Sequence, residues 1–122
     1  MSRFLIRTVC TGVKFDLTAV NGQVIATSEI YETKAACRKG IESVRKNAPV
    51  ARVEDQTGED WKRQSNPKFE LFRDKAGEFR FRLKATNGKV IAVSEGYVTK
   101  AACENGIDSV KVNAQEAEIA EE

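Results

Sequence analysis

The sequence contains no histidine, and this absence excludes several kinds of chemistry at once. Ser-His-Asp and Cys-His catalytic groups cannot form without histidine, and neither can metal sites with imidazole ligands. Cysteine is scarce: Cys10, Cys37 and Cys103 include no CxxC pair, and an odd count is not a disulfide framework. This cysteine usage suits a reducing compartment, so we expect a cytoplasmic protein.

Long apolar runs and a strong charge bias are also missing. No stretch approaches the ~20 apolar residues of a membrane span, and Arg7 interrupts the short apolar run that could otherwise suggest a signal peptide. We expect no membrane association. The net charge of +2 makes no case by itself for a polyanionic partner. Glutamates crowd the last seven residues, and we expect this acidic tail to be frayed.

What is present is one segment written twice. Residues 21–48 read NGQVIATSEIYETKAACRKGIESVRKNA, and residues 87–114 read NGKVIAVSEGYVTKAACENGIDSVKVNA, with 19 of 28 positions identical. The correspondence continues backwards at the same offset of 66 residues, pairing Arg7 with Arg73. Because two copies are too few for a solenoid, they suggest an internal dimer with an approximate two-fold axis.

Each copy predicts the same series of elements, β-β-β-α-β, and therefore an α+β fold. Alternation of apolar and polar residues predicts strands over 13–19 and 79–85, each followed by Asn-Gly and a return strand over 23–27 or 89–93. The turns Asn21-Gly22 and Asn87-Gly88 favour type I′ hairpins. An earlier strand over 4–9 or 69–74 completes a meander, and strands over 50–54 and, more weakly, 116–120 end the copies.

A helix lies between the third and fourth strands of each copy. Thr33 and Thr99 are the expected N-caps, and an apolar arc through Cys37, Ile41 and Val44 predicts that one helix face packs on the sheet. We expect Asn47 and its equivalent Asn113 to end the helices in the left-handed conformation.

The two repeats are joined by a polar stretch. We place the first repeat at residues 1–55, a linker at 56–68, and the second repeat with the acidic tail at 69–122. The linker sequence QTGEDWKRQSNP carries a single tryptophan, Trp61. We interpret Trp61 as a local anchor against the protein body; the alternative is a contact to a ligand.

The repeated pattern NGxVIAxSExYxTKAACxxGIxSVxxNA resembles the YegP-like family of small uncharacterised bacterial and archaeal proteins. The resemblance covers nearly the whole chain apart from the linker and the tail. It implies that the tandem units mimic a homodimer of single-unit members. It also implies one continuous antiparallel sheet with both helices on one face and the C-terminal strands exchanged between the units. It brings no activity with it.

Several repeated positions allow a structural and a functional interpretation. Cys37 and Cys103 read as small core residues or as a thiol pair near the two-fold axis. Gly40 and Gly106 each cost ~1 kcal/mol inside a helix, and we expect them to permit close approach to the sheet or to the sister helix. The Ser-Glu-x-Tyr segments at 28–31 and 94–97 satisfy backbone groups or carry function, and a Ser-Lys dyad with Lys34 or Lys100 has no supporting motif.

The sheet face away from the helices is the main candidate binding surface. If Leu5 and Leu71 point inward, the outward residues combine bases with large apolar side chains: Phe4, Ile6, Lys14, Phe72, Arg80, Arg82 and Lys84. Such a face can be a solvated surface, a protein contact or a nucleic-acid-binding sheet, although Asp16 interrupts the basic stripe and no RNP-type motif is present.

The first helix shows five bases against one acid on its polar side, whereas its twin is nearly balanced. Drift explains this difference, and so would one asymmetric partner site. No acid-base pair, metal cluster or glycine-rich phosphate loop is visible. We therefore expect a non-enzymatic protein without a cofactor, monomeric with an internal pseudo-dimer. We interpret it as a protein-interaction or structural module; the alternative is a weak nucleic-acid binder that uses the open sheet face.

Overall fold

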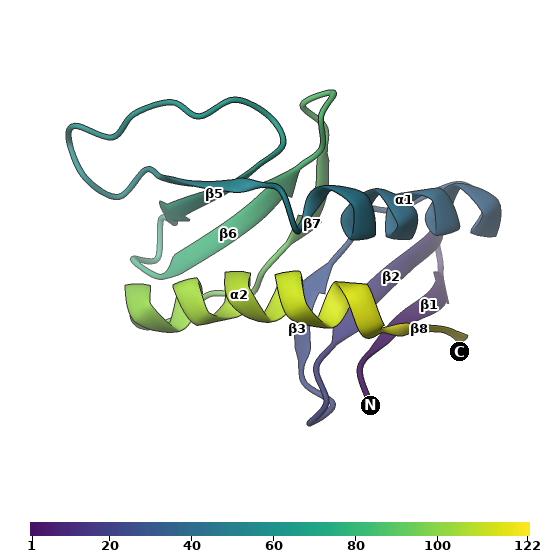
Figure 1. Cartoon of the computed structure of the whole chain (residues 1–122). Helices are drawn as coiled ribbons and strands as arrows, with labels where there is room; N and C mark the ends of the chain where they lie inside the picture. The colour runs from purple at the N-terminus through teal and green to yellow at the C-terminus, as the bar shows by residue number, and fades with distance from the viewer.

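The computed structural model describes residues 1–122 as two β-β-β-α-β units, as the sequence predicts. All eight strands lie in one sheet, and both helices cover the same face of it (Figure 1). Neither helix is long and apolar enough to span a bilayer. The first unit contains β1 (Arg3–Val9), β2 (Gly12–Thr18), β3 (Val24–Thr27), α1 (Lys34–Asn47) and β4 (Arg52–Asp55). The second contains β5 (Lys68–Arg73), β6 (Phe79–Lys84), β7 (Val90–Val93), α2 (Lys100–Glu116) and β8 (Glu118–Glu121).

The strand order, β4-β5-β6-β7-β3-β2-β1-β8, shows the exchange of C-terminal strands. The two meanders meet where Thr27 of β3 pairs with Val93 of β7. The last strand of each unit crosses to the other unit, so that β4 pairs with β5 and β8 pairs with β1. Both outer pairs are parallel, so the expectation of a wholly antiparallel sheet is wrong and the sheet is mixed. The reason is that β4 and β8 follow helical crossovers, and only a tight hairpin forces neighbouring strands to be antiparallel.

The Asn-Gly turns form hairpins of a different type from the one predicted. Gly22 has φ of 85°, but no non-glycine residue in the chain has a positive φ, so Asn21 does not take the conformation that a type I′ turn requires. Instead, Gly22 N donates to Ala19 O at 2.9 Å and Ala19 N donates to Gln23 O at 2.9 Å. This is a three-residue loop closed by a glycine bulge, and the Asn87-Gly88 turn repeats it.

The helix N-termini match the prediction, and the C-termini do not. The hydroxyls of Thr33 and Thr99 accept from the backbone amides three residues later, at 3.0 and 3.1 Å. Asn47 and Asn113 have negative φ and do not form left-handed caps. Their side-chain amides donate to the carbonyls four residues earlier, at 2.8 Å in each helix. These asparagines therefore stabilise the last turn from within, and α2 continues past Asn113 to Glu116.

The first strand of the first unit has the opposite phase from the one predicted. Phe4 and Ile6 are fully buried beneath the helices, where they pair with Leu17 and Phe15 of β2. The prediction that Phe4 and Ile6 face outward is therefore wrong, and Leu5 takes the outward position. The physical reason is that hairpin register, set by the turn, decides which residues of an all-apolar run meet the core.

The equivalent strand of the second unit shows why the 66-residue offset between the repeats does not apply to their first strands. Phe69 and Leu71 occupy the core and pair with Leu83 and Phe81, so Phe72 points outward as predicted. Counted between equivalent paired residues, the connection from Leu71 to Phe81 is one residue longer than the connection from Ile6 to Phe15. Consequently, the first strands correspond at an offset of 65 residues, and the partner of Arg7 is Phe72 rather than Arg73.

The helix glycines make room for a tyrosine ring. A Cβ atom at Gly40 would lie 2.3 Å from Tyr31 Oη, and one at Gly106 would lie 2.5 Å from Tyr97 Oη. Tyr31 in turn stacks on Phe15 with 6.4 Å between ring centroids, and the second unit repeats the stack. The predicted close approach is thus to the tyrosine that precedes each helix rather than to the sister helix, and at Gly106 also to the sheet, where Phe81 lies 3.1 Å from such a Cβ.

Candidate functional site

The repeated cysteines and serines have structural roles, in the core and in hydrogen bonds to the backbone. Cys37 and Cys103 are fully buried, and burial raises the pKa of both thiols, that of Cys103 to about 11. Ser28 Oγ accepts from Phe15 N at 2.9 Å and donates to Glu29 O at 2.7 Å, and the second repeat has the same arrangement around Ser94. These groups support the structural interpretation of both positions.

The basic side of α1 holds the C-terminal segment. Lys34 and Arg38 contact the carboxylate of Glu121 at 2.7 and 2.6 Å, and Arg45 donates to the carbonyls of Ala114 and Ala117. The acidic tail is therefore a paired strand, and the expectation that it is frayed is wrong. Three of the five bases on this helix have contacts within the chain, which accounts for most of its charge difference from α2.

On the first repeat, the open face is balanced in charge. Asp16 is buried and contacts both neighbouring cations, with Lys14 Nζ at 3.1 Å and Arg7 Nε at 3.0 Å. Because Arg7 Nε also lies 3.3 Å from Glu122 Oε2, two cations face two carboxylates, and this part of the face offers little free positive charge. Lys14 is therefore an ion-paired residue on the predicted surface.

On the second repeat, the predicted bases and the aromatic residue come together. The Arg82 guanidinium lies over the Phe72 ring, 4.4 Å from its centroid, which is the geometry of a cation–π contact. Arg80 Nε lies 2.6 Å from Asp74 Oδ2. Hydrogen bonds from Arg80 and nearby backbone amides lower the pKa of Asp74 and keep it ionised.

A buried carboxylate gathers three of the bases on this face. Glu70 is only 4% exposed, and Arg82 Nε and Lys84 Nζ approach its two oxygens at 2.5 and 3.2 Å. Lys68 Nζ lies 3.4 Å from the second oxygen. Burial opposes ionisation of Glu70, but the hydrogen bonds from Arg82 and Lys84 outweigh it and lower the pKa of this carboxyl.

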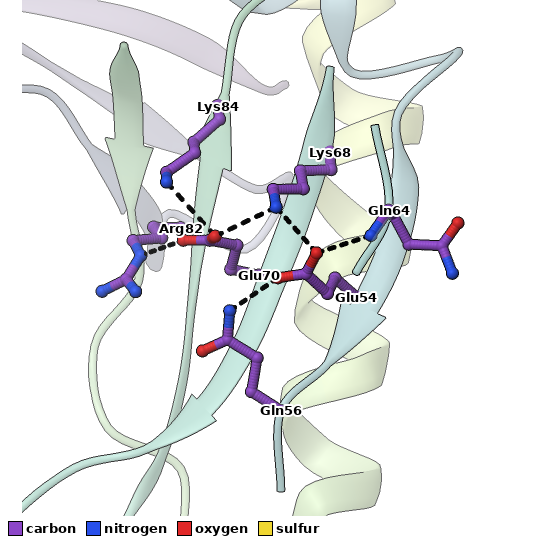
Figure 2. A network of polar contacts seen from close by, with 7 residues as sticks. All are labelled: Glu54, Gln56, Gln64, Lys68, Glu70, Arg82 and Lys84. Atoms are coloured by element: carbon purple, nitrogen blue, oxygen red, sulfur yellow. Dashed lines mark hydrogen bonds and ion pairs between the residues drawn. The ribbon is translucent and has the colours of Figure 1, made fainter. Parts of the chain in front are cut away.

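Lys68 continues the network to the edge strand β4. Its ammonium lies 2.7 Å from Oε2 of Glu54, whose side chain is 1% exposed (Figure 2). Gln64 N donates to the same oxygen and Gln56 Nε2 donates to Oε1, both at 2.7 Å. Burial opposes ionisation of Glu54, yet these donors hold its pKa at about 2. The network of Glu54, Lys68, Glu70, Arg82 and Lys84 is called the charge network below.

The linker turns this part of the face into a cavity. Residues 56–67 connect two parallel neighbours, β4 and β5, and the connection must therefore return along the strands. It forms the large loop beside β5 in Figure 1. An open cavity of about 740 Å³ lies between the linker and the sheet. Its lining includes four members of the charge network and, from the linker, Trp61 and Arg63. Trp61 is 42% exposed and so is not a fully packed anchor.

The charge network breaks the symmetry of the two repeats. Strand pairing places Ala120 and Leu5 of the first repeat where the second has Glu54 and Glu70. Arg3 of the first repeat occupies the position of Lys68 in the second. Asp16 and Thr18 occupy the positions of Arg82 and Lys84. At these positions the first repeat has only a smaller cluster, in which Arg7 and Lys14 contact one buried carboxylate, Asp16.

The sequence reading identified Arg82, Lys84 and Phe72 but missed Glu54, Lys68 and Glu70. Alternation in KFELFR, residues 68–73, carries a signal, because Lys68 and Glu70 flank the core residue Phe69. The partner Glu54 could not be found in this way, since it reaches the site only through strand exchange.

The fold and this site define a class of protein: a tandem α+β protein with exchanged edge strands and one polar, charge-lined cavity. The chain belongs to the family described as Domain of unknown function (DUF1508), whose model matches residues 12–55 and 74–121. This confirms the resemblance noted in the sequence.

Bacterial relatives align either with most of the chain or with one repeat of it. The chain is 40% identical over 108 residues to a UPF0339 protein of Pseudomonas aeruginosa, covering 88% of this chain and 84% of that protein. It is 44% identical over 101 residues to the UPF0339 protein YegP of Escherichia coli, covering 82% and 77%. A Treponema denticola relative, 57% identical over 54 residues, is matched over 93% of its length but only 44% of this chain, so it corresponds to one repeat.

Solved structures agree with the fold. The solution NMR structure of yegP from E. coli, a protein of unknown function, superposes with a TM-score of 0.79 at 33% identity, covering 98% of this chain and 91% of that one. A UPF0339 protein of Shewanella oneidensis gives 0.80 at 31% identity, covering 98% and 90%. The names of these relatives indicate no specific function.

Proposed function

We propose that this protein is a non-catalytic interaction module that engages a protein partner through the open sheet face of its second repeat. The observation that supports this proposal is the charge network, which occurs in one half of a symmetric scaffold. A buried ion pair is rarely more stabilising than apolar packing of similar volume. The first repeat builds the same sheet with Ala120 and Leu5 at the equivalent places, so the scaffold does not require the network.

The linker strengthens the proposal, because it adds an exposed tryptophan and free cations beside the network. Tryptophan and arginine are the residues that most often carry binding energy at protein interfaces. Trp61 and Arg63 both line the cavity rim, and Arg63 forms no ion pair within the chain. A partner that covers this surface would find an aromatic anchor beside unpaired positive charge.

The test is affinity capture from a native lysate with matched baits. The site variant is W61A/R63E, which changes only linker residues, and the control is K39E/K46E, which reverses charge on α1 at the opposite face. Both variants must keep the circular dichroism of the wild type. We expect one set of proteins to bind the wild type and the control but not the site variant. Equal capture by all three baits, or none above background, contradicts the proposal.

Nucleic-acid binding is the competing function and has less support. Carboxylates pair with the bases on the open face and divide them into separate clusters, so no continuous basic stripe is left for a phosphate backbone, and Arg82 covers the one outward aromatic ring of β5. Fluorescence anisotropy with single- and double-stranded DNA and RNA, at low and physiological salt, separates the two functions. Binding that survives physiological salt and prefers one form favours nucleic acid, whereas binding that vanishes with salt does not.

We further infer that the protein works as a monomer in the cytoplasm. Three unpaired cysteines, two of them in the core, suit a reducing environment. The second repeat supplies β8, the edge strand beside β1 that a second subunit would otherwise supply. Light scattering should give the monomer mass of 13.5 kDa; twice that mass contradicts the inference.

A further inference from the structure

We propose that the cavity beneath the linker is a binding site for a carboxylate or phosphate group. The inference names the chemistry recognised at the surface described above, and to that extent it rests on the proposed function. The group could belong to a free small molecule or to an acidic side chain of a protein. The proposal follows from which hydrogen-bonding groups in the cavity are already used and which are not.

The acceptors of the cavity are occupied. Each oxygen of Glu54 and of Glu70 has at least one donor: Gln56 on one oxygen of Glu54, with Lys68 and Gln64 N on the other. Arg82 contacts one oxygen of Glu70, and both lysines contact the other. A ligand rich in donors would therefore compete with existing partners for these carboxylates.

The donors are in surplus. An ammonium has three N–H groups and a guanidinium has five. Lys84 has one ion-pair partner, Glu70. Arg63, Ser65 and Asn66 line the cavity and donate no side-chain hydrogen bond within the chain. The unused capacity of the site thus calls for an acceptor, and charged acceptors make the strongest such bonds.

The balance of charge points the same way. Three cations line the cavity, Arg63, Lys68 and Lys84, against the two carboxylates Glu54 and Glu70. Arg82, which contacts Glu70 from the next strand, adds further positive charge. An entering anion offsets this excess, whereas an entering cation increases it.

The size of the cavity and the position of Trp61 describe the rest of the ligand. About 740 Å³ falls within the ~300–1,000 Å³ of small-molecule sites and exceeds what a bare anion fills. Trp61 is the single hydrophobic residue in the lining. The anionic group therefore binds toward Lys84 and Arg63, and a flat or aliphatic remainder lies against the indole.

The test is a titration of the ¹⁵N-labelled full chain followed by ¹H–¹⁵N NMR, with succinate, inorganic phosphate and a tetraglutamate peptide as separate probes. We expect saturable shifts at the Trp61 indole and at the amides of residues 63–66. The variants R63Q and R63Q/K84Q should weaken binding, the double variant at least about tenfold, which corresponds to ~1.4 kcal/mol. The matched control R3Q changes the position equivalent to Lys68 in the first repeat and should leave affinity unchanged.

The outcomes separate the two sources of the anion. Saturation by succinate or phosphate supports a free small molecule, and saturation by the peptide alone supports an acidic protein segment. Absence of saturable shifts at residues 61–66 with every probe overturns the proposal, as does equal affinity of wild type and R63Q/K84Q. If no anion binds while W61A/R63E still abolishes protein capture, the anion chemistry is wrong and the protein-partner function stands. If an anion binds but no protein is captured, the anion site stands and the protein-partner function is wrong.

Discussion

Replacing Lys68 by methionine tests whether the charge network acts as one coupled unit. The substitution keeps the aliphatic stem but leaves Glu54 without its cation, while Glu70 keeps Arg82 and Lys84. Removing one partner of a buried ion pair costs ~3–5 kcal/mol. Because one of the two carboxylates remains paired, we expect a loss near ~3 kcal/mol in the free energy of unfolding and a fall in Tm of roughly 10 °C.

The assay is urea unfolding followed by circular dichroism, with K68M/E54Q to complete the comparison and R3M as the control. The double variant should be more stable than K68M, since it no longer buries an unpaired carboxylate. R3M, at the exposed equivalent position, should change stability by no more than ~0.5 kcal/mol. A K68M loss below ~1 kcal/mol, or a double variant less stable than K68M, would refute the reasoning.

Acid should reduce the K68M deficit. In the wild type, Glu54 has a pKa of about 2 and remains ionised at pH 3. Without Lys68, burial dominates and raises the pKa of this carboxyl, so that it binds a proton at pH 3 and the penalty of an unpaired buried charge disappears. The difference in unfolding free energy between wild type and K68M is therefore expected to be smaller at pH 3 than at pH 7. A constant difference contradicts this account.

Three other outcomes are expected. Gly40→Ala should lower stability by ~1–3 kcal/mol through overpacking against Tyr31, instead of the gain of ~1 kcal/mol usual for alanine in a helix; a higher Tm contradicts this. Because the pKa of Glu54 is lowered from 4.5 to about 2, its contribution is complete above pH 4.5 and is lost as the pH falls toward 2, so urea titrations should show the stability difference between wild type and E54Q shrinking across that window. Glu121→Gln breaks only exposed pairs and should cost less than ~1 kcal/mol, less again in 1 M salt; a larger loss would show that β8 depends on them.

The hairpins and helix starts could be predicted because they depend on neighbouring residues. The turn at Asn21-Gly22 and the helix start at Thr33 could be predicted without knowledge of the rest of the chain. The turn type was wrong because a single positive φ at glycine is enough when the loop has three residues. The phase of β1 was wrong because Phe4, Leu5 and Ile6 are all apolar, and alternation cannot choose between the two faces of such a strand.

The site was less predictable than the fold, for a reason of distance along the chain. Glu54 and Lys68 are on strands that belong to different repeats, and they meet only because β4 crosses to the other half. The basic residues of β6 were visible in the sequence, but their neutralising partners on β5 and β4 were not assigned to the same face. The local alternation therefore suggested a basic surface, whereas the tertiary pairing makes a mixed network with a cavity.

The exchange of edge strands also affects how the chain can fold as it is made. The residues of β1 are synthesised well before those of β8, yet the two strands are direct neighbours in the sheet. The sheet edge at β1 therefore stays open until β8 has been made, and such long-range pairing is slow because the intervening chain must be closed into a loop. An unpaired edge of this kind invites pairing with other chains. The duplication that supplies each repeat with a permanent neighbour thus leaves the nascent protein exposed to aggregation until β8 is free to pair with β1.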